Sequence, residues 1–241
     1  MTKEVYILAA ARTPIGSFGG SLRSLSAPQL GAKAIEGVLK QTPLTFSVDE
    51  VIMGNVLQAN VGQAPARQAS MGAGLPVTTI ATTVNKVCAS GLKAVTLGVQ
   101  SILSGDAKVI IAGGMESMSN TPFYATSTRW GHKYGDTTLI DGIAKDGLTD
   151  AYEGYAMGVA ADHCAMKYRI SREQQDQFAK ESYQKSQKAI QEGFFEKEII
   201  PVEIKARNSA HIVSQDEEPF QVKFEKLPTL RPAFSKEGTV T

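Results

Sequence analysis

The chain has 241 residues, with 25 Lys or Arg against 24 Asp or Glu, which gives a formal net charge of +1. This length supports one large or two modest domains with sizeable cores, and the balanced charge gives no basic face for a nucleic acid. Its two cysteines are too few for a disulfide framework, and no uninterrupted apolar run approaches 18 residues, so we expect a cytoplasmic protein with no membrane partner and no leader peptide.

In the first part of the chain, expected strands alternate with expected helices. Apolar runs predict strands, and apolar residues at helical spacing predict helices, in the order 5–10 (strand), 27–41 (helix), 51–56 (strand), 63–73 (helix), 81–87 (strand), 89–103 (helix) and 108–112 (strand). The helix at 89–103 is apolar on nearly every side, and two of the expected strands lack any polar alternation. This pattern predicts a parallel or mixed sheet that is covered on both faces.

After Met118 the pattern changes. Residues 119–150 show no sustained periodicity and are expected to be loop-rich. Long irregular segments are usually functional or hold subunits together, and a tolerated surface insertion is the alternative. Helical spacing returns at 154–168, an expected edge strand with Pro201 follows at 198–205, and polar turns frame a second short strand before Asp216.

The firmest boundaries belong to an expected helix at 171–192. Ser171 and Gln174 have the spacing of a capping box, and Gly193 supplies a C-terminal stop. Phe178 and Ile190 are expected to share a buried face of this helix.

Cys88 is the candidate catalytic residue. It lies where the β-branched run Thr82–Val87 meets a helix that begins with small residues. At such an elbow, unpaired N–H groups and the positive end of the helix dipole stabilise a thiolate. Because Ala89, Ser90 and Gly91 are small residues, they leave space around the sulfur for a bulky substrate. The alternative is a small buried apolar residue at a tight crossing.

Other residues of chemical interest give weaker signals. The histidines His132, His163 and His211 have no metal-ligand spacing, so no metal site is expected. Cys164 lies among apolar residues of an expected helix and is interpreted as core. Gly113–Gly114 lacks the full spacing of a dinucleotide fingerprint and is assigned to close backbone approach, with a plain strand-end turn as the alternative.

Separate motifs resemble the thiolase family, in order along the chain: Ala9–Gly16, Gly62–Gln68, Val87–Gly91 and Ala112–Met118. The segment Asp150–Gly158 most resembles the cytosolic, sterol-pathway members found in fungi. The resemblance implies an α/β fold, with a thiolase-like first domain at 1–118 that has a layered mixed sheet and helices on both faces. It also implies an α+β loop domain at 119–241 that covers bound coenzyme A.

The activity implied by the resemblance is acyl transfer through Cys88. Two acetyl-CoA molecules condense to acetoacetyl-CoA and coenzyme A, or the reverse thiolysis occurs, with no tightly bound cofactor and with room for a monovalent cation. The segment Ala125–Ile140 is expected to lie between subunits of a homo-oligomer, a dimer or a tetramer. Two alternatives are a degradative 3-ketoacyl-CoA thiolase and a non-catalytic fragment that binds coenzyme A or a partner.

Five positions match family residues that contact coenzyme A. Leu148 and Met157 match residues that line the pantetheine tunnel, and Phe234 matches one beside the pantetheine chain. Tyr183 matches a residue near the adenine, and Lys226 a basic residue near the phosphates. The plain alternatives are that Leu148 and Phe234 are core and that Lys226 is a solvated charge.

Two positions depart from the family pattern. Ala156 stands where many members have His, and Gln221 stands where an Arg often contacts the nucleotide. Gln221 is expected to weaken affinity rather than chemistry, unless Lys223 or Arg231 compensates.

The resemblance also implies that this chain is the N-terminal portion of a thiolase. The family's activating His, its oxyanion-hole Asn and its second catalytic Cys match a region that would follow Thr241. The last strands of the first domain and a whole second domain would also lie there. We therefore expect residues 1–241 alone to be inactive.

Overall fold

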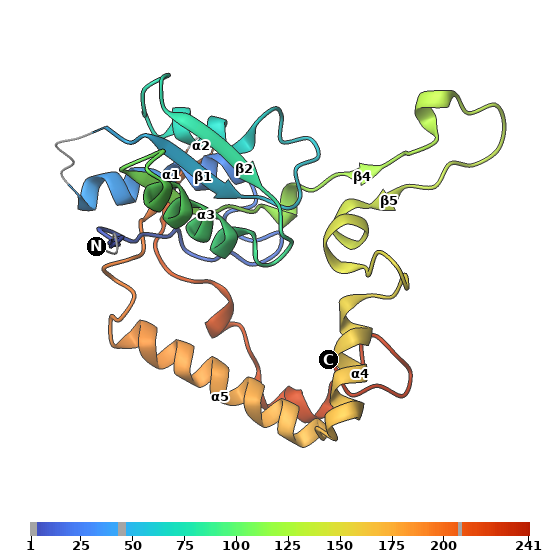
Figure 1. The fold of residues 1–241 in the computed structure, drawn as a ribbon. Coiled ribbons are helices and arrows are strands. Elements are labelled where there is room, and N and C mark those ends of the chain that lie inside the picture. Colours follow the sequence, from blue (N-terminus) through green and yellow to red (C-terminus); the bar gives the residue numbers. More distant parts are fainter. Residues whose placement is uncertain (1–3, 43–46, 207–208) are drawn as a thin grey trace.

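The computed structural model describes residues 4–42, 47–206 and 209–241, and its centre is a parallel sheet (Figure 1). The strands are β1 (Glu50–Gly54), β2 (Ile80–Val84) and β3 (Ile110–Gly114), in the order β2-β1-β3. Both pairings of β1 are parallel, and Gly54 is in register with Val84 and Gly114. Since β1 is the middle strand, its Val51, Ile52 and Met53 are buried. The predicted α/β class is confirmed.

Helices cover both faces of this sheet. The helices are α1 (Ala27–Gln41), α2 (Pro65–Gly72) and α3 (Ser90–Ser104), close to their predicted bounds. Val51 and Met53 share a core cluster with residues of α1 and α2. Side chains alternate along a strand, so the side chain of Ile52 points to the opposite face, where α3 packs with its Gly98 against Ile110 and Ala112.

The predicted strand at 5–10 is wrong. In the described part of the chain these residues belong to no strand, and Tyr6, Ile7 and Leu8 are largely exposed. A strand needs a ladder partner, and no described segment hydrogen-bonds to this run. Pairing begins only at Arg12, which forms a single parallel bridge with Ile199.

Helix α3 is more exposed than its composition suggests. By length and mean hydropathy residues 87–104 are a candidate membrane span, although Ser90, Lys93 and Gln100 interrupt the apolar residues of this stretch. The buried residues of α3 are small, namely Ser90, Ala94 and Gly98, and its Leu92 is exposed. Because Ala94 and Gly98 lie against the sheet, we describe α3 as a helix of the sheet domain, which comprises the elements from α1 to β3.

The segment after β3 is loop-rich, as predicted. Two-residue strands β4 (Phe123–Tyr124) and β5 (Ile140–Asp141) pair antiparallel, and a long loop between them extends away from the sheet domain (Figure 1). Trp130 and Tyr134 in this loop are exposed by 88% and 98%. A short π-helix, Ala144–Leu148, then leads back toward the sheet.

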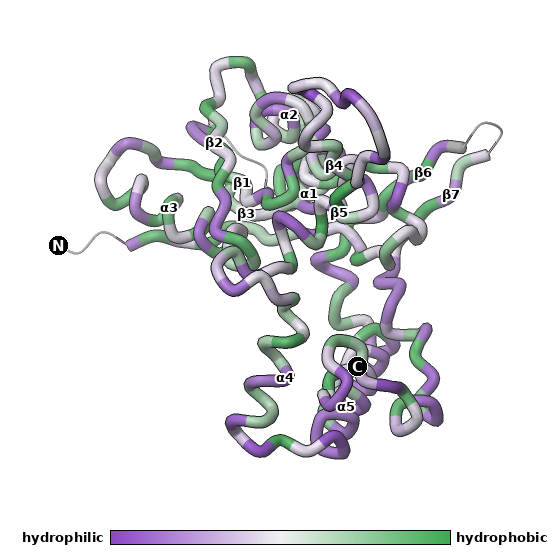
Figure 2. The backbone as a smooth tube through the Cα atoms, turned by 90° about the vertical axis from the view of Figure 1, so that its right-hand side faces the viewer, coloured by the Kyte–Doolittle hydropathy of each residue, from purple (hydrophilic) through white to green (hydrophobic). Residues whose placement is uncertain are grey.

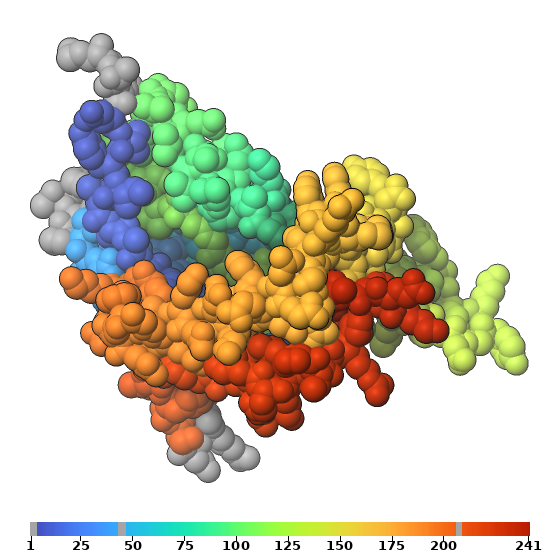
Figure 3. Space-filling model, turned by 90° about the horizontal axis from the view of Figure 1, so that it is seen from below, coloured from blue at the N-terminus to red at the C-terminus, as the bar shows by residue number. Residues whose placement is uncertain are grey.

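The last part of the chain has a long helix at its centre. The elements are α4 (Met157–Tyr168), α5 (Arg172–Gln191), the antiparallel pair β6 (Val202–Ala206) and β7 (Ser209–Val213), and short 3-10 helices at Glu218–Phe220 and Phe224–Thr229. Figure 2 shows that α5 is mostly hydrophilic, and Figure 3 shows the C-terminal segment lying along it.

The ends of α5 agree with the sequence, but its buried face does not. Ser171 and Gln174 form the predicted capping box, and Gly193 after the helix has a φ of +73°. Phe178, however, is 75% exposed, so the prediction that it is buried is wrong. The helix has no fully buried residue, because the elements that contact it, two short 3-10 helices, cover only part of its surface.

Candidate functional site

Cys88 lies on a tight elbow between β2 and α3. β2 ends at Val84, four residues earlier, and α3 begins at Ser90 with Ala89 as its N-cap. The helix therefore starts two residues after Cys88 rather than directly after it. Val87, on the other side of Cys88, has a φ of +49°, in the left-handed region. The thiol is exposed, so the alternative of a buried apolar cysteine is wrong.

The thiol lines a cavity of about 410 Å³ at the carboxyl ends of the parallel strands. In parallel α/β sheets, ligands bind at this edge. Much of the wall is apolar, and the apolar side chains come from Val56, Leu57, Val87, Met115, Met118, Ile143 and Leu148. Cys88 and Glu116 are the ionisable side chains of the lining. Such a cavity suits an acyl group that is carried close to a thiol.

Glycines let the strand ends approach the start of α3. A Cβ added at Gly54 would lie 2.6 Å from the Ser90 carbonyl carbon and 2.7 Å from the Gly91 nitrogen. A Cβ added at Gly114 would lie 3.3 Å from the Gly91 Cα. The close backbone approach predicted for Gly113–Gly114 is therefore confirmed at Gly114. It is wrong at Gly113, where an added Cβ would make only an ordinary contact, 3.7 Å from Met53 Sδ.

Glu116 is a cavity residue that the sequence did not single out. Its carboxylate accepts hydrogen bonds from Asn55 Nδ2 (2.7 Å), from the Val56 N–H (2.8 Å) and from the Leu57 N–H (3.1 Å). These bonds join the segment after β1 to the segment after β3. Glu116 thus serves as a fixed acceptor in the wall. No local pattern indicates this role, since its partners lie about 60 positions earlier.

Three of the five predicted coenzyme A residues lie along a series of contacts that leads from this cavity to the start of α4. Leu148 lines the cavity. Thr149, the next residue, forms an antiparallel bridge with Ala156. This bridge places Leu148 close to the start of α4, where Met157 is the first residue. The ring of Phe234 packs on Gly158, where an added Cβ would lie 2.2 Å from it. Phe234 and Leu148 are 46% and 42% exposed, so the alternative that they are core is wrong.

Tyr183 and Lys226 lie together at another place. The Tyr183 ring meets Phe224 edge to face, with ring centroids 6.4 Å apart. Lys226 follows in the same 3-10 helix and is exposed. Gln221 donates a hydrogen bond from its Nε2 to Ser17 Oγ at 2.9 Å, so its amide contacts the first part of the chain.

A carboxylate holds Phe234 on α4. Asp162 accepts hydrogen bonds from Ser235 Oγ (2.7 Å), the Thr239 N–H (2.8 Å) and the Val240 N–H (3.0 Å). The bond from Ser235 and these N–H groups lower the pKa of Asp162, against the effect of desolvation. The segment that follows Phe234 is thereby fixed to the helix that carries Met157.

The histidines lie apart from the thiol. None of them lines the Cys88 cavity: His132 bonds to the Gly135 carbonyl, His163 packs against Tyr155, and His211 is on β7. Within the described residues, no group of three His, Cys, Asp or Glu could hold a metal. The interpretation of Cys164 as core is wrong, because it lies on the exposed side of α4.

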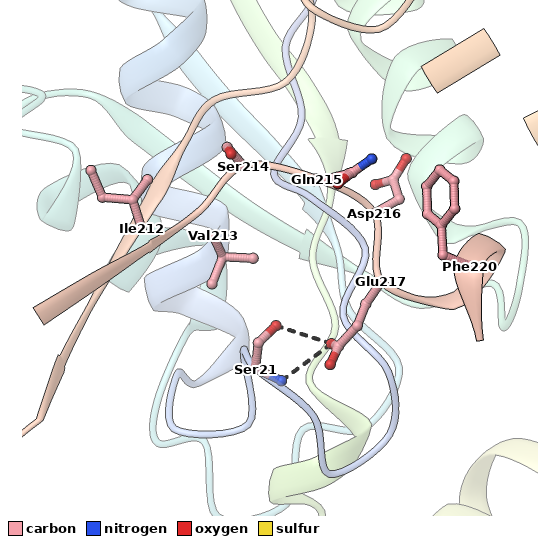
Figure 4. A pocket seen from close by; sticks show the side chains of 8 residues that line it. All are labelled: Ser21, Ile212, Val213, Ser214, Gln215, Asp216, Glu217 and Phe220. Carbon is pink, nitrogen blue, oxygen red and sulfur yellow. Dashed lines mark hydrogen bonds between the residues drawn. The ribbon is translucent and has the colours of Figure 1, made fainter. Parts of the chain in front are cut away.

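A second concavity, of about 540 Å³, lies between the end of β7 and the loop at Ser21 (Figure 4). Glu217 in its wall accepts from the Ser17 N–H (2.9 Å), the Ser21 N–H (3.2 Å) and Ser21 Oγ (3.0 Å). The bond from the Ser17 N–H is the main cause of a lowered pKa of Glu217. The Glu217 carboxylate is thus occupied by hydrogen bonds from the loop before α1. We therefore interpret the concavity as a contact between this loop and the segment after β7, and not as a ligand site.

Comparisons with known proteins show what the whole chain is similar to. A family model described as "Thiolase, N-terminal domain" matches residues 5–241. The acetyl-CoA acetyltransferase of Saccharomyces cerevisiae is 55% identical, and the match covers 100% of this chain and 62% of that protein. The "Acetyl-CoA acetyltransferase ERG10, cytosolic" of Gibberella zeae is 52% identical, with 98% and 60% covered.

A solved structure has the same fold. The Acat5 thiolase from Ascaris suum, crystallised in complex with coenzyme A, matches with a TM-score of 0.91 and 42% identity over 99% of this chain and 61% of that chain. The chain described here thus spans about 60% of the length of the relatives it matches.

Proposed function

The chain belongs to the thiolase family, and we propose that it supplies the nucleophile and the coenzyme A site of an acetyl-CoA acetyltransferase. The observation that carries the proposal is an exposed Cys88 thiol on a strand-to-helix elbow, inside a mainly apolar cavity. The names of its relatives support acetyl-CoA as the acyl donor. The reaction is the condensation of two acetyl-CoA to acetoacetyl-CoA and coenzyme A, or its reverse.

Cys88 performs the covalent step. Its thiolate attacks the thioester carbonyl of acetyl-CoA, a new C–S bond forms at Cys88, and coenzyme A leaves as the thiol after taking up a proton. The enolate of a second acetyl-CoA then attacks the acetyl-enzyme and releases acetoacetyl-CoA and the free thiolate. The apolar wall formed by residues such as Met115 and Leu148 keeps water from the thioester.

The coenzyme A moiety is proposed to run outward from the cavity. Leu148 lines the cavity, and Phe234 packs on Gly158 next to Met157 at the start of α4. Tyr183 of α5 contacts Phe224, in the same 3-10 helix as Lys226. The apolar side chains suit the pantetheine chain, Tyr183 suits the adenine, and Lys226 suits a phosphate. Coenzyme A esters are substrates, no tightly bound cofactor is required, and a monovalent cation is compatible with the reaction.

The condensation needs a general base, and the described lining of this cavity supplies none. Glu116 is the other ionisable side chain of the described lining, but three N–H donors already hold its carboxylate. Proton removal from a second acetyl-CoA therefore needs a group from outside this cavity. We propose that the 241-residue chain alone accepts an acetyl group on Cys88 without turnover.

Assembly and location are part of the same proposal. The loop between β4 and β5 exposes Trp130 and Tyr134 at a distance from the sheet domain, which favours a homo-oligomer, a dimer or tetramer, with 125–140 between subunits. The name of the Gibberella relative supports a cytoplasmic location. The enzyme that contains this chain would then supply acetoacetyl-CoA to sterol synthesis by the mevalonate route.

The alternatives are separated by substrate. An acetyl-CoA acetyltransferase that contains this chain cleaves acetoacetyl-CoA faster than a longer 3-ketoacyl-CoA, whereas a degradative thiolase prefers the longer ester. Both activities are measured as coenzyme A-dependent thiolysis. A non-catalytic fragment would bind coenzyme A but would form no acetyl adduct on Cys88, and mass spectrometry detects that adduct.

A further inference from the structure

Val87, directly before Cys88, has a backbone conformation that its side chain disfavours. Its φ of +49° lies in the left-handed region, where β-branched residues are rare because their Cβ substituents meet the backbone. The other described non-glycine residues with positive φ are Asn60, Ala64 and Arg169, and none of these is β-branched. Something must hold Val87 in this conformation.

The hydroxyl of Ser90 makes hydrogen bonds on both sides of Val87. Ser90 Oγ accepts from the Lys86 N–H at 2.8 Å and donates to the Val87 carbonyl at 2.6 Å. Asn85 adds a third bond, since its Oδ1 accepts from the Val87 N–H at 2.9 Å. Ser90 is buried, with 4% of its surface exposed, so water does not replace these bonds easily.

The start of α3 cannot move to relieve this strain. Gly54 at the end of β1 approaches so closely that an added Cβ would be 2.7 Å from the Ser90 Cβ. The sheet thus fixes the position of Ser90, and the hydrogen bonds of its hydroxyl fix the backbone of Lys86 and Val87 relative to α3. The elbow, rather than the helix, takes up the strained conformation.

We propose that Ser90 is a positioning residue for Cys88. Its hydroxyl holds Val87 in the left-handed region, and this conformation directs the next residue, Cys88, into the cavity. Without the hydroxyl, Val87 relaxes toward an extended conformation and the thiol turns away from the cavity. The value of this positioning for acyl transfer rests on the proposed function, but the orientation of the thiol can be tested without it.

The test compares two exposed thiols within one molecule. The 241-residue chain is treated with iodoacetamide, and peptide mass spectrometry gives the ratio of the alkylation rates of Cys88 and Cys164. In Ser90→Ala this ratio falls about tenfold, since two hydrogen bonds that orient the elbow are lost. The control Ser104→Ala removes a hydroxyl from the other end of α3, where it bonds to the Ser101 carbonyl and to Asp106, and leaves the ratio unchanged.

Rescue separates positioning from a general loss of structure. Glycine adopts positive φ without strain, so Ser90→Ala should lower the ratio much less in a Val87→Gly background, and the double variant V87G/S90A should lie well above Ser90→Ala alone. An unchanged ratio in Ser90→Ala, or a double variant as low as Ser90→Ala, overturns the proposal. If Ser90→Ala loses its far-UV circular dichroism, the double variant decides: recovery of fold and ratio supports the proposal, and failure of either overturns it.

The same samples distinguish this inference from the proposed function. Each is also incubated with acetyl-CoA and analysed for an acetyl group on Cys88. If alkylation follows the expected pattern but no variant accepts acetyl, the positioning role stands and the proposed function fails. If Cys88 is acetylated but Ser90→Ala alkylates normally, the proposed function stands and the positioning role fails.

Discussion

Arg12 and Asp216, which are 204 positions apart in the chain, form a bidentate ion pair. Arg12 Nη1 donates to Asp216 Oδ1 at 2.7 Å, and Nη2 donates to Oδ2 at 2.9 Å. Arg12 Nε also donates to Glu198 at 2.7 Å, and the guanidinium lies 5.0 Å from the centre of the Phe195 ring. This pair fastens the segment before α1 to the segment after β7.

Replacement of Arg12 should therefore weaken the contact between these two segments and lower the stability of the protein. Burial raises the pKa of Asp216, but the bonds from Arg12 and from the Ile15 N–H outweigh it, and the net shift is downward. In Arg12→Ala this carboxylate loses its main partner, and the free energy of unfolding falls by roughly 1.5–3 kcal/mol. Denaturant titration measures the change.

A matched control is the more exposed pair between Lys33 and Glu36, 3.0 Å apart within α1. Lys33→Ala should cost less than about 1 kcal/mol. Equal losses in Lys33→Ala and Arg12→Ala would show that the long-range pair has no special role.

Asp162 should make stability depend on pH. Its folded pKa is lowered, chiefly by the bond from Ser235, so the folded state binds fewer protons than the unfolded state in acid. Its contribution is complete above the unfolded pKa of about 3.9 and is lost as pH falls through the lower folded value. We expect Ser235→Ala to be less stable than the unsubstituted chain at pH 7 and to approach it in acid. A stability difference that stays constant between neutral and acid pH would contradict this assignment.

Tyr183 should contribute to coenzyme A affinity through its ring. In Tyr183→Ala the edge-to-face contact with Phe224 is lost, and Lys226 in the same 3-10 helix loses its support. The Kd for coenzyme A should rise roughly twofold to tenfold, as expected for an aromatic contact of about 0.5–1.5 kcal/mol. Tyr183→Phe keeps the ring and serves as the control, and calorimetry measures both. An unchanged Kd in Tyr183→Ala would remove this residue from the site.

Turnover should be absent from the 241-residue chain. General-base catalysis contributes about 10²–10⁴-fold, and the described lining of the Cys88 cavity offers no free base. Chain that has been separated from host thiolase should therefore cleave at most one equivalent of acetoacetyl-CoA. Many turnovers would require a base that we have not identified, and His132, His163 and His211 would be the first residues to replace.

Local signals in the sequence predicted local structure well. The capping box at Ser171 is complete within four residues, and it correctly marked the start of α5. The elbow at Cys88 was also predictable, because a β-branched run before small residues indicates where a strand meets a helix. Residues 5–10 failed the same logic, since an apolar run becomes a strand only beside a partner.

Contacts between distant segments were not predictable. The strain at Val87 depends on the approach of Gly54 to Ser90, and the role of Glu116 depends on N–H groups about 60 positions earlier. The exposure of Phe178 and Cys164 depends on which elements cover α5 and α4. Such features follow from the packing of the whole chain rather than from a pattern within one element.

The mass of each cysteine peptide after incubation with acetyl-CoA shows which thiol of the chain accepts the acetyl group. We expect one acetyl group on Cys88 and none on Cys164, although both thiols are exposed. Cys88→Ser should abolish the thioester adduct, which hydroxylamine should otherwise remove. A chain that binds coenzyme A but leaves Cys88 unmodified, or that acetylates Cys164 equally, would contradict the assignment of Cys88 as the nucleophile.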